Sequence, residues 1–190
     1  MEITEIKKLE DEVIVREFIL TKNPALFDII YERYEQKIFF KCLNFSNDTN
    51  EASDLAHDVF LKIFLNLSAF KFKSKFSTWV FSITYNLCID YVKRNRLEFV
   101  EIEPDSEYDV EEYDDHHLLQ IKVDNLTRLL NKLKPEEKAV ILMKYLDGLN
   151  IKEISAIMNI GESAVKMRIK RTKNKLVQMN NEQEKLLNNN

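Results

Sequence analysis

The stretch IKEISAIMNIGESAVKMRIKRTKNK, residues 151–175, decides the fold that the sequence predicts. Apolar residues recur at helical spacing on both sides of the tripeptide Asn159-Ile160-Gly161. Because Asn and Gly tolerate positive φ, this tripeptide predicts a tight turn between two helices. A helix, a three-residue turn and a second helix form a helix-turn-helix. We expect the second helix to begin at Glu162 or Ser163 and to end near Met179.

The second helix of this motif carries dense positive charge. Residues 162–175 hold six cations against one Glu, while Val165, Ile169 and Leu176 fall on the inward face. Such a stripe attracts DNA phosphates, and residues near the start of a recognition helix reach base edges. We expect base contacts from Glu162, Ser163, Lys166, Met167 and Lys170, with Arg168 outside the core beside them, and backbone contacts from Arg171, Lys173 and Lys175. The alternative is a solvated basic face, which the turn and the preceding apolar Ile154 and Ile157 disfavour.

The composition of the whole chain favours helices. Its 190 residues include 45% hydrophobic residues but only 2 Gly and 3 Pro, too few turn residues for a sheet protein. Apolar periodicity predicts further helices at residues 13–20, 24–38, 52–63, 77–93, 118–133, 135–146 and 151–158. Pro24 and Pro135 each occupy a first helical position, where the missing N–H costs nothing. The predicted fold class is all-α.

Charge is segregated along the chain and predicts its domains. Residues 97–121 contain ten Asp or Glu and no Lys or Arg, whereas residues 122–190 contain 14 Lys or Arg against 8 Asp or Glu. Low hydrophobicity with high net charge prevents independent packing. We therefore predict two small helical domains, 1–96 and 118–180, joined by a flexible acidic linker, 97–117. The Asn-rich and Glu-rich tail, 181–190, is expected to be disordered.

The sequence carries no sign of export or membrane insertion. The first eight residues mix charges and lead into no apolar run, and no stretch approaches the ~20 apolar residues of a membrane helix. Cys42 and Cys88 lie in apolar periodic segments with no CxxC spacing. Buried free thiols in a reducing, cytoplasmic environment are the expectation.

An aromatic and basic run lies in the first domain. The segment FKFKSKFSTW, residues 70–79, alternates aromatic rings with lysines. Aromatic rings stack on unpaired bases, and lysines neutralise the nucleic-acid backbone. We expect exposure for Phe72, Lys73 and Lys75. The alternative, that aromatic residues of this run are core, applies to Phe70, Phe76 and above all Trp79.

Three segments resemble the extracytoplasmic-function (ECF) branch of the sigma-70 family. EASDLAHDVFLKIFLNLSAF, residues 51–70, is similar to the helix that binds the polymerase β′ clamp. FSTWVFSITYNLCIDYVKR, residues 76–94, is similar to the helix that recognises the −10 element. LKPEEKAVILMKYLDGLNIKEISAIMNI, residues 133–160, together with the basic helix after it, is similar to the −35 reader.

The resemblance implies roles for individual residues. Polymerase contacts are implied for Asp54, Asp58, Leu61 and Lys62. An everted base of the −10 strand would be held by the loop Phe72–Phe76, which includes Lys73 and Lys75. The mouth of that pocket would be lined by Asn86, Trp79, Ser82 and Ile83, and phosphates would be bound by Lys93, Arg94 and Arg96. The −35 element would be read by Ser163, Lys166, Met167 and Lys170.

The function that the resemblance implies is a sigma factor, a non-enzymatic subunit without cofactor that directs promoter-specific initiation. Its expected partners are core RNA polymerase, through the β′ clamp and β flap, promoter DNA and an anti-sigma factor. The acidic linker would thread the RNA exit channel. Four sites depart from the family pattern: His57 replaces Gln, Ser155 replaces Ala, Ala164 replaces Thr, and Lys71-Phe72-Lys73 stands where Gly is frequent. These departures leave the promoter sequence open.

Three other function classes fit parts of the sequence. His57-Asp58 and the run Asp114-Asp115-His116-His117 suggest a metal-dependent hydrolase, but the first pair has no second pair at ligand spacing in its domain. A conventional helix-turn-helix regulator, independent of core polymerase, would need a sensor or dimerisation domain in residues 1–96. A protein-interaction adaptor leaves the basic helix unexplained.

Overall fold

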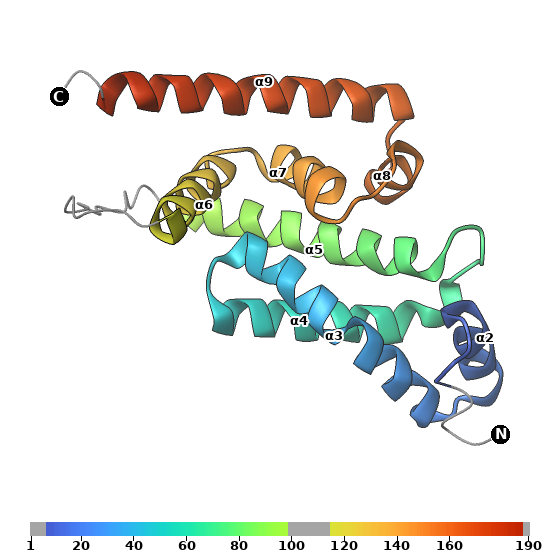
Figure 1. Ribbon diagram of the computed structural model, residues 1–190. Coiled ribbons are helices and arrows are strands. Elements are labelled where there is room, and N and C mark those ends of the chain that lie inside the picture. The colour runs from blue at the N-terminus through green and yellow to red at the C-terminus, as the bar shows by residue number, and fades with distance from the viewer. Residues whose placement is uncertain (1–6, 99–114, 188–190) are drawn as a thin grey trace. The chain divides into compact units, whose positions relative to one another are not determined.

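The computed structural model describes residues 7–98 and 115–187, and they divide into two units (Figure 1). The first unit is built mainly from residues up to Val92 and the second mainly from the residues that follow. The described residues are helical with no strand, which confirms the all-α prediction. None of these helices combines the length and the apolarity needed to cross a membrane.

The elements follow the predicted order closely. The first part of the chain forms α2 (Asp11–Thr21), α3 (Pro24–Ser46), α4 (Thr49–Asn66), a single 3-10 turn η1 (Leu67–Ala69) and α5 (Phe76–Glu98). The second part forms α6 (Asp115–Asn131), α7 (Pro135–Ile141), a π-helical turn η2 (Leu142–Leu146), α8 (Ile151–Met158) and α9 (Glu162–Leu187).

Short polar segments set the starts of the long helices. The Asn23 side chain accepts a hydrogen bond from the backbone nitrogen of Ala25 at 3.1 Å, ahead of Pro24 in the first helical position. The Asp48 carboxylate accepts two, from Asn50 at 2.8 Å and Glu51 at 2.9 Å. These caps satisfy amide groups that have no partner within the helix, so α3 and α4 begin where the sequence predicts.

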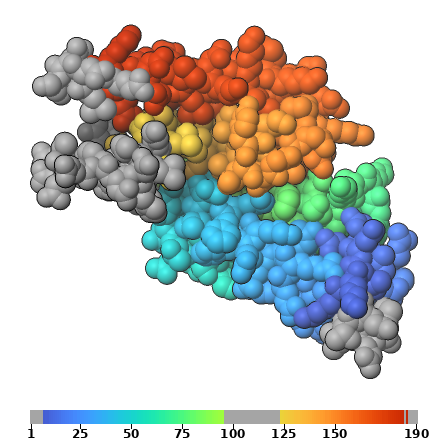
Figure 2. All heavy atoms as spheres, in the orientation of Figure 1, coloured from blue at the N-terminus to red at the C-terminus, as the bar shows by residue number. Residues whose placement is uncertain are grey.

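The core of the first unit lies between α2, α3, α4 and α5. Its fully buried apolar side chains come from all four helices: Ile14, Val15, Ile38, Val59, Ile63, Phe76 and Val80. The thiols of Cys42 in α3 and Cys88 in α5 are also buried, with their sulfur atoms 3.9 Å apart. Both cysteines are free, as the sequence predicts. In Figure 2 α2 and α3, in shades of blue, lie at the surface that faces the viewer.

The core of the second unit lies between α7 and α9, which pack along each other, orange and red in Figure 2. Ala139, Val140 and Met143 are buried on one side, and Val165 is buried on the other. An ion pair fixes the two helices in register, because Lys175 Nζ lies 2.8 Å from Glu137 Oε2. The inward face predicted for the second helix of the motif is confirmed at Val165 and Ile169, which are buried, while Leu176 is half-buried.

The structure moves three predicted boundaries. Helix α5 includes residues 97–98 and α6 includes residues 115–117, all expected in the linker; the rest of the linker, 99–114, lies outside the described residues. Helix α9 continues to Leu187. The predicted helix end near Met179 and the predicted disorder of residues 181–187 are therefore wrong, and residues 188–190 lie outside the described residues. Hydrogen bonds support the extension: Gln178 to Glu182 at 2.9 Å, and Asn125 of α6 to Asn180 at 3.2 Å.

Candidate nucleic-acid and polymerase interfaces

The helix-turn-helix forms from α8 and α9. Asn150 and Glu153 cap α8 reciprocally, with side-chain to backbone distances of 3.0 and 2.9 Å. Asn159 then adopts a left-handed conformation with φ 50°, which allows the turn that the sequence predicts. The backbone nitrogen of Val165 donates to the Gly161 carbonyl at 3.1 Å and starts α9.

The first turns of α9 present the predicted DNA-contacting residues to solvent. Exposed side chains are Glu162, Ser163, Lys166, Met167, Lys170, Arg171 and Lys173, whereas Arg168 is half-buried. Thr172, on the inward face, is buried and was not anticipated. Lys175 differs from the expectation of a DNA-backbone contact, because Glu137 holds its ammonium group within the unit.

A cationic groove runs beside the recognition helix. It has a volume of about 330 Å³ and is lined by four lysines, Lys144, Lys166, Lys170 and Lys173, together with Tyr145, Ile151, Ile169 and Asn174. The Lys173 ammonium lies 5.8 Å from the centre of the exposed Tyr145 ring. The groove adds Lys144 and Tyr145 to the site. Sequence reasoning missed both because they lie in η2, before α8, outside the helix-turn-helix itself.

The aromatic side chains in and beside the loop between η1 and α5 differ in how far they are buried. Phe70 is buried, Phe72 and Trp79 are half-buried, and Lys73 and Lys75 are exposed. Phe76, expected among the DNA contacts, is 0% exposed. That expectation needs correction, since a fully buried ring cannot touch DNA directly; Phe76 instead packs under Trp79, 5.6 Å away and stacked.

Phe72 has an unusual backbone. Its φ of 55° lies in the left-handed region, which residues with a side chain seldom adopt. The ring lies 4.6 Å from Phe70, centre to centre, and 4.7 Å from the Arg16 guanidinium of α2. The loop is thus held in a specific conformation that leaves part of one aromatic ring at the surface.

Helix α5 carries the other residues expected to contact the −10 strand. Asn86, Lys93 and Arg94 are exposed. Ser82 and Ile83 are half-buried, and the Ser82 hydroxyl donates to the Trp79 carbonyl at 2.8 Å. The side chain of Arg96 lies outside the described residues.

The outer face of α4 is polar with a cluster of exposed apolar residues. All four residues expected to contact polymerase, Asp54, Asp58, Leu61 and Lys62, are exposed. Phe64 and Leu65 are also exposed on this helix and were not anticipated. Exposed large apolar side chains at neighbouring positions are typical of an interaction surface.

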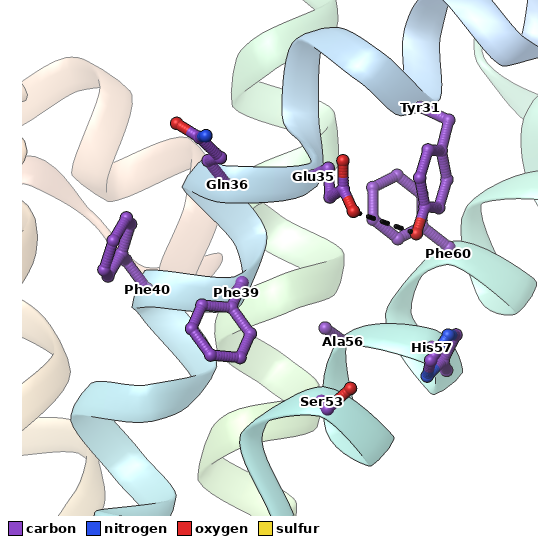
Figure 3. A pocket seen from close by; sticks show the side chains of 9 residues that line it. All are labelled: Tyr31, Glu35, Gln36, Phe39, Phe40, Ser53, Ala56, His57 and Phe60. Atoms are coloured by element: carbon purple, nitrogen blue, oxygen red, sulfur yellow. Dashed lines mark hydrogen bonds between the residues drawn. The ribbon is translucent and has the colours of Figure 1, made fainter. Parts of the chain in front are cut away.

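A groove between α3 and α4 lies beside that face (Figure 3). It has a volume of about 410 Å³, and its lining includes Tyr31, Glu35, Phe39, Phe40, His57 and Phe60. Burial raises the pKa of the Tyr31 hydroxyl, and the Glu35 carboxylate, 3.5 Å away, raises it further. The phenol therefore stays protonated at neutral pH and gives the groove a polar edge. In the ranges that the structure describes, no group of three His, Cys, Asp or Glu is placed to hold a metal ion.

A second apolar groove lies between α6 and α9. It has a volume of about 460 Å³ and is lined by Asn125, Leu126, Leu129, Leu176, Val177, Asn180 and Asn181. Leu126 and Val177 are more than half exposed. This groove depends on the extension of α9 past the predicted end of the helix.

Two regions of the chain match family models. Residues 30–98 match Sigma-70 region 2 and residues 124–176 match Sigma-70, region 4. Among curated proteins, the chain is 28% identical over 158 residues to the ECF RNA polymerase sigma factor SigW of Bacillus subtilis, covering 77% of this chain and 84% of SigW. It is 30% identical over 152 residues to SigM of the same organism, covering 78% of this chain and 91% of SigM.

Solved structures share the fold. The structure of CnrH in complex with the cytosolic domain of CnrY aligns with a TM-score of 0.66 at 19% identity, covering 90% of this chain and 97% of CnrH. The sigma factor RpoE in complex with the anti-sigma factor NepR from Bartonella quintana aligns at 0.60 and 18%, covering 80% and 94%. With region 2, region 4 and a relative at 30% identity in agreement, this chain belongs to the ECF branch of the sigma-70 family of RNA polymerase sigma factors.

Proposed function

We propose that this sigma factor recognises promoter DNA at two places with two separate units. The exposed start of α9 reads the −35 duplex, and the loop 71–75 with α5 holds the unpaired −10 strand. The observation that carries the proposal is the exposed cationic face on the first turns of α9, mounted on a helix-turn-helix. The proposal assigns −10 recognition to the unit expected at 1–96 and −35 recognition to the unit expected at 118–180, with their helix ends moved as α5, α6 and α9 require.

Reading of the −35 element rests on geometry and charge together. The side chains of Ser163, Lys166, Met167 and Lys170 project from one end of α9, where a recognition helix meets base edges. Arg171 and Lys173 follow on the same helix and bind phosphates. Lys144, beside them in the cationic groove, extends the phosphate-binding surface.

Strand separation rests on the aromatic loop. The exposed part of the Phe72 ring offers a stacking surface for a base. Lys73 and Lys75 are exposed beside it and can bind the phosphate backbone of the DNA strand. Stacking of a base on an aromatic ring contributes roughly 1–3 kcal/mol. Trp79, Ser82, Ile83 and Asn86 line the mouth of the pocket, and Lys93 and Arg94 bind phosphates further along α5. The free energy gained when the base is captured offsets part of the cost of unpairing the duplex.

Association with core polymerase uses two surfaces. The β′ clamp binds the exposed face of α4 that carries Asp54, Asp58, Leu61 and Lys62, and Phe64 and Leu65 enlarge its apolar part. The β flap binds the apolar groove that Leu126 and Val177 line. Because apolar surface on both faces is exposed in the free chain, its burial favours assembly.

The protein acts without chemistry of its own. It needs no cofactor, because polymerase forms the bonds and the sigma factor only binds, positions and separates strands. Its place of action is the cytoplasm, where polymerase and chromosome lie. An anti-sigma factor is the proposed regulator, by analogy with the neighbour RpoE, whose structure is described with one. The acidic segment, with ten carboxylates and no cation in residues 97–121, suits a positively lined RNA channel.

Reconstitution with core RNA polymerase tests the proposal. The purified chain is added to core enzyme on a library of promoter fragments, and start sites are mapped. We expect association with core and selection of a defined promoter class, and much weaker binding of the same DNA by the isolated chain, whose net charge is −4. Failure to associate with core, or unchanged start sites, would reject a sigma role.

Two variants make this test residue-specific. Lys170→Ala should reduce initiation and change the −35 preference, while Lys185→Ala, exposed near the other end of α9, should do neither. Tight, promoter-specific binding by the chain without core would instead favour a conventional helix-turn-helix regulator.

A further inference from the structure

Helix α2 contacts the aromatic loop through two side chains one turn apart. The Glu12 carboxylate accepts a hydrogen bond from the backbone nitrogen of Phe76 at 2.6 Å. The Arg16 guanidinium lies 4.7 Å from the centre of the Phe72 ring. Because residues i and i+4 share one helix face, a single face of α2 engages both ends of the loop.

The contact of Glu12 is a helix cap supplied from a distance. Phe76 is the first residue of α5, and its amide belongs to the first turn, whose N–H groups have no partner within the helix. A carboxylate is favourable there because it faces the positive end of the helix dipole. Caps usually come from the adjoining residues, whereas this one comes from 64 residues earlier. The start of α5 is therefore fixed to α2.

The contact of Arg16 fixes the ring that the loop presents. Arg16 is exposed and Phe72 is half-buried, so the cation covers an aromatic surface that would otherwise meet water. The left-handed backbone of Phe72 needs restraint from outside the loop, since its own local preference opposes that conformation.

Helix α2 is itself held firmly enough to serve as an anchor. Ile14 and Val15 are fully buried beneath it. The Asp11 carboxylate accepts hydrogen bonds from Arg33 and from the Tyr34 hydroxyl of α3. Burial and the hydrogen bond to Asp11 raise the pKa of Tyr34 far above its ordinary value, so the hydroxyl remains a donor at every physiological pH.

We propose that Glu12 and Arg16 are positioning residues for capture of the unpaired −10 base, and that α2 is a working part of that site. The proposal deepens the function assigned to the loop and rests on it. Helix α2 lies before residue 30, where the match to region 2 begins. By holding the loop in its bound conformation beforehand, the two side chains lower the ordering cost that the captured base must offset.

The test measures binding of holoenzyme to forked promoter DNA with an unpaired −10 strand. The promoter is one selected in the library experiment. Each strand position is also replaced, one at a time, by an abasic nucleotide. Phe72→Ala serves as the reference: it should weaken binding of the intact strand but lose its effect on the DNA that lacks the captured base. That position identifies the base that Phe72 contacts.

Arg16→Ala and Glu12→Ala should reproduce this pattern. We expect binding of the intact strand to weaken roughly 2- to 5-fold for Arg16→Ala and roughly tenfold for Glu12→Ala, with much smaller losses on the same abasic DNA. Glu12→Gln, which keeps an oxygen acceptor, should restore most of the binding. Core association should be unchanged in all of them.

Two controls separate positioning from general stability. Lys37→Ala removes another cation held over an aromatic ring, 5.3 Å from the centre of Tyr34, and should leave strand binding unchanged. Glu17→Gln removes an exposed carboxylate from α2 itself and should also be silent. Lys37→Ala matches Arg16→Ala in chemistry, and Glu17→Gln matches the Glu12 variants in its location on α2.

The outcomes distinguish the two layers of the proposal. If Phe72→Ala has no effect on any strand, the role of the loop fails and this inference falls with it. If Phe72→Ala behaves as expected but neither Arg16→Ala nor Glu12→Ala weakens binding of the intact strand, only the inference about α2 is overturned. Equal losses on intact and abasic strands would also overturn it, because they would indicate a merely structural role.

Discussion

Glu137 Oε2 accepts a hydrogen bond from Lys175 Nζ at 2.8 Å and another from the backbone nitrogen of Lys134 at 3.0 Å. One carboxylate therefore caps α7 and binds the middle of α9. Because α9 carries the proposed −35 contacts, the same ion pair connects the recognition helix to the start of α7.

The ion pair predicts an acid-sensitive contribution to stability. Burial by itself raises the pKa of Glu137, but the hydrogen bonds from Lys175 and Lys134 outweigh it and hold the pKa below its ordinary value. A folded-state pKa below the unfolded one means that the pair stabilises the fold above the ordinary Glu range, about pH 4.3, and loses this effect as pH falls through the lowered pKa.

Glu137→Gln should lower the free energy of unfolding at pH 7 by about 0.5–1 kcal/mol, the range for a partly exposed pair. Urea unfolding at pH 7 and near pH 3 measures the difference, which should become smaller in acid. Glu182→Gln, an exposed change elsewhere on α9, is the control and should have no effect at either pH. An equal deficit at both pH values would contradict the assignment.

Two neighbouring residues of α4 should separate stability from binding. Ile63 is 0% exposed and Leu61 is 58% exposed. Ile63→Ala should cost about 2–5 kcal/mol through lost burial and the cavity left behind, whereas Leu61→Ala should stay within about 0.5 kcal/mol of wild type. Denaturant unfolding measures both.

Core binding should show the reverse order for the same pair. Leu61→Ala should weaken affinity for core polymerase, measured by competition with a labelled sigma factor, because an apolar contact at the clamp is lost. Ile63→Ala, assayed where it is still folded, should bind core normally. Wild-type affinity for Leu61→Ala would remove this side chain from the proposed interface.

The cap of α4 should be measurable as a single acceptor. Asp48→Ala removes the acceptor of two backbone hydrogen bonds and should destabilise the protein by about 1 kcal/mol. Asp48→Asn keeps an oxygen acceptor and should lose less. Thermal unfolding followed by circular dichroism compares the three proteins, and equal melting temperatures would show that the cap is dispensable.

The salt dependence of promoter binding should identify phosphate contacts on α9. Lys173→Ala in holoenzyme should reduce the slope of log K against log salt by about 1. Lys185→Ala, on the same helix near its C-terminal end, should leave the slope unchanged. A loss of affinity for Lys173→Ala with an unaltered slope would mean that this lysine acts by some other contact.

Local signals in the sequence were enough to predict most helices. Asn23-Pro24 and Asp48 each mark a helix start by chemistry confined to a few residues, and Asn159 permits the turn of the helix-turn-helix. The end of α9 was not predictable in this way. Its last turns are polar, and one of their contacts is the hydrogen bond between Asn180 and Asn125, 55 residues away.

The exposure of the candidate site residues was predictable where it follows from helical periodicity. The exposed face of α9 and the four residues of α4 are of this kind. Phe76 was misplaced because an alternation of aromatic residues and lysines does not reveal which rings turn inward. Glu12 and Arg16 were missed because their partners lie in a distant segment, and no local pattern marks such a contact.

The left-handed backbone at Phe72 has a consequence for engineering. Glycine would relieve a conformational cost of roughly 1–2 kcal/mol at this position, and the resemblance suggests that glycine is frequent in this tripeptide of related chains. A stabilisation campaign guided by consensus would therefore choose glycine here. The product would withstand heat better and would lack the ring proposed to receive the base, so melting temperature and promoter opening would change in opposite directions.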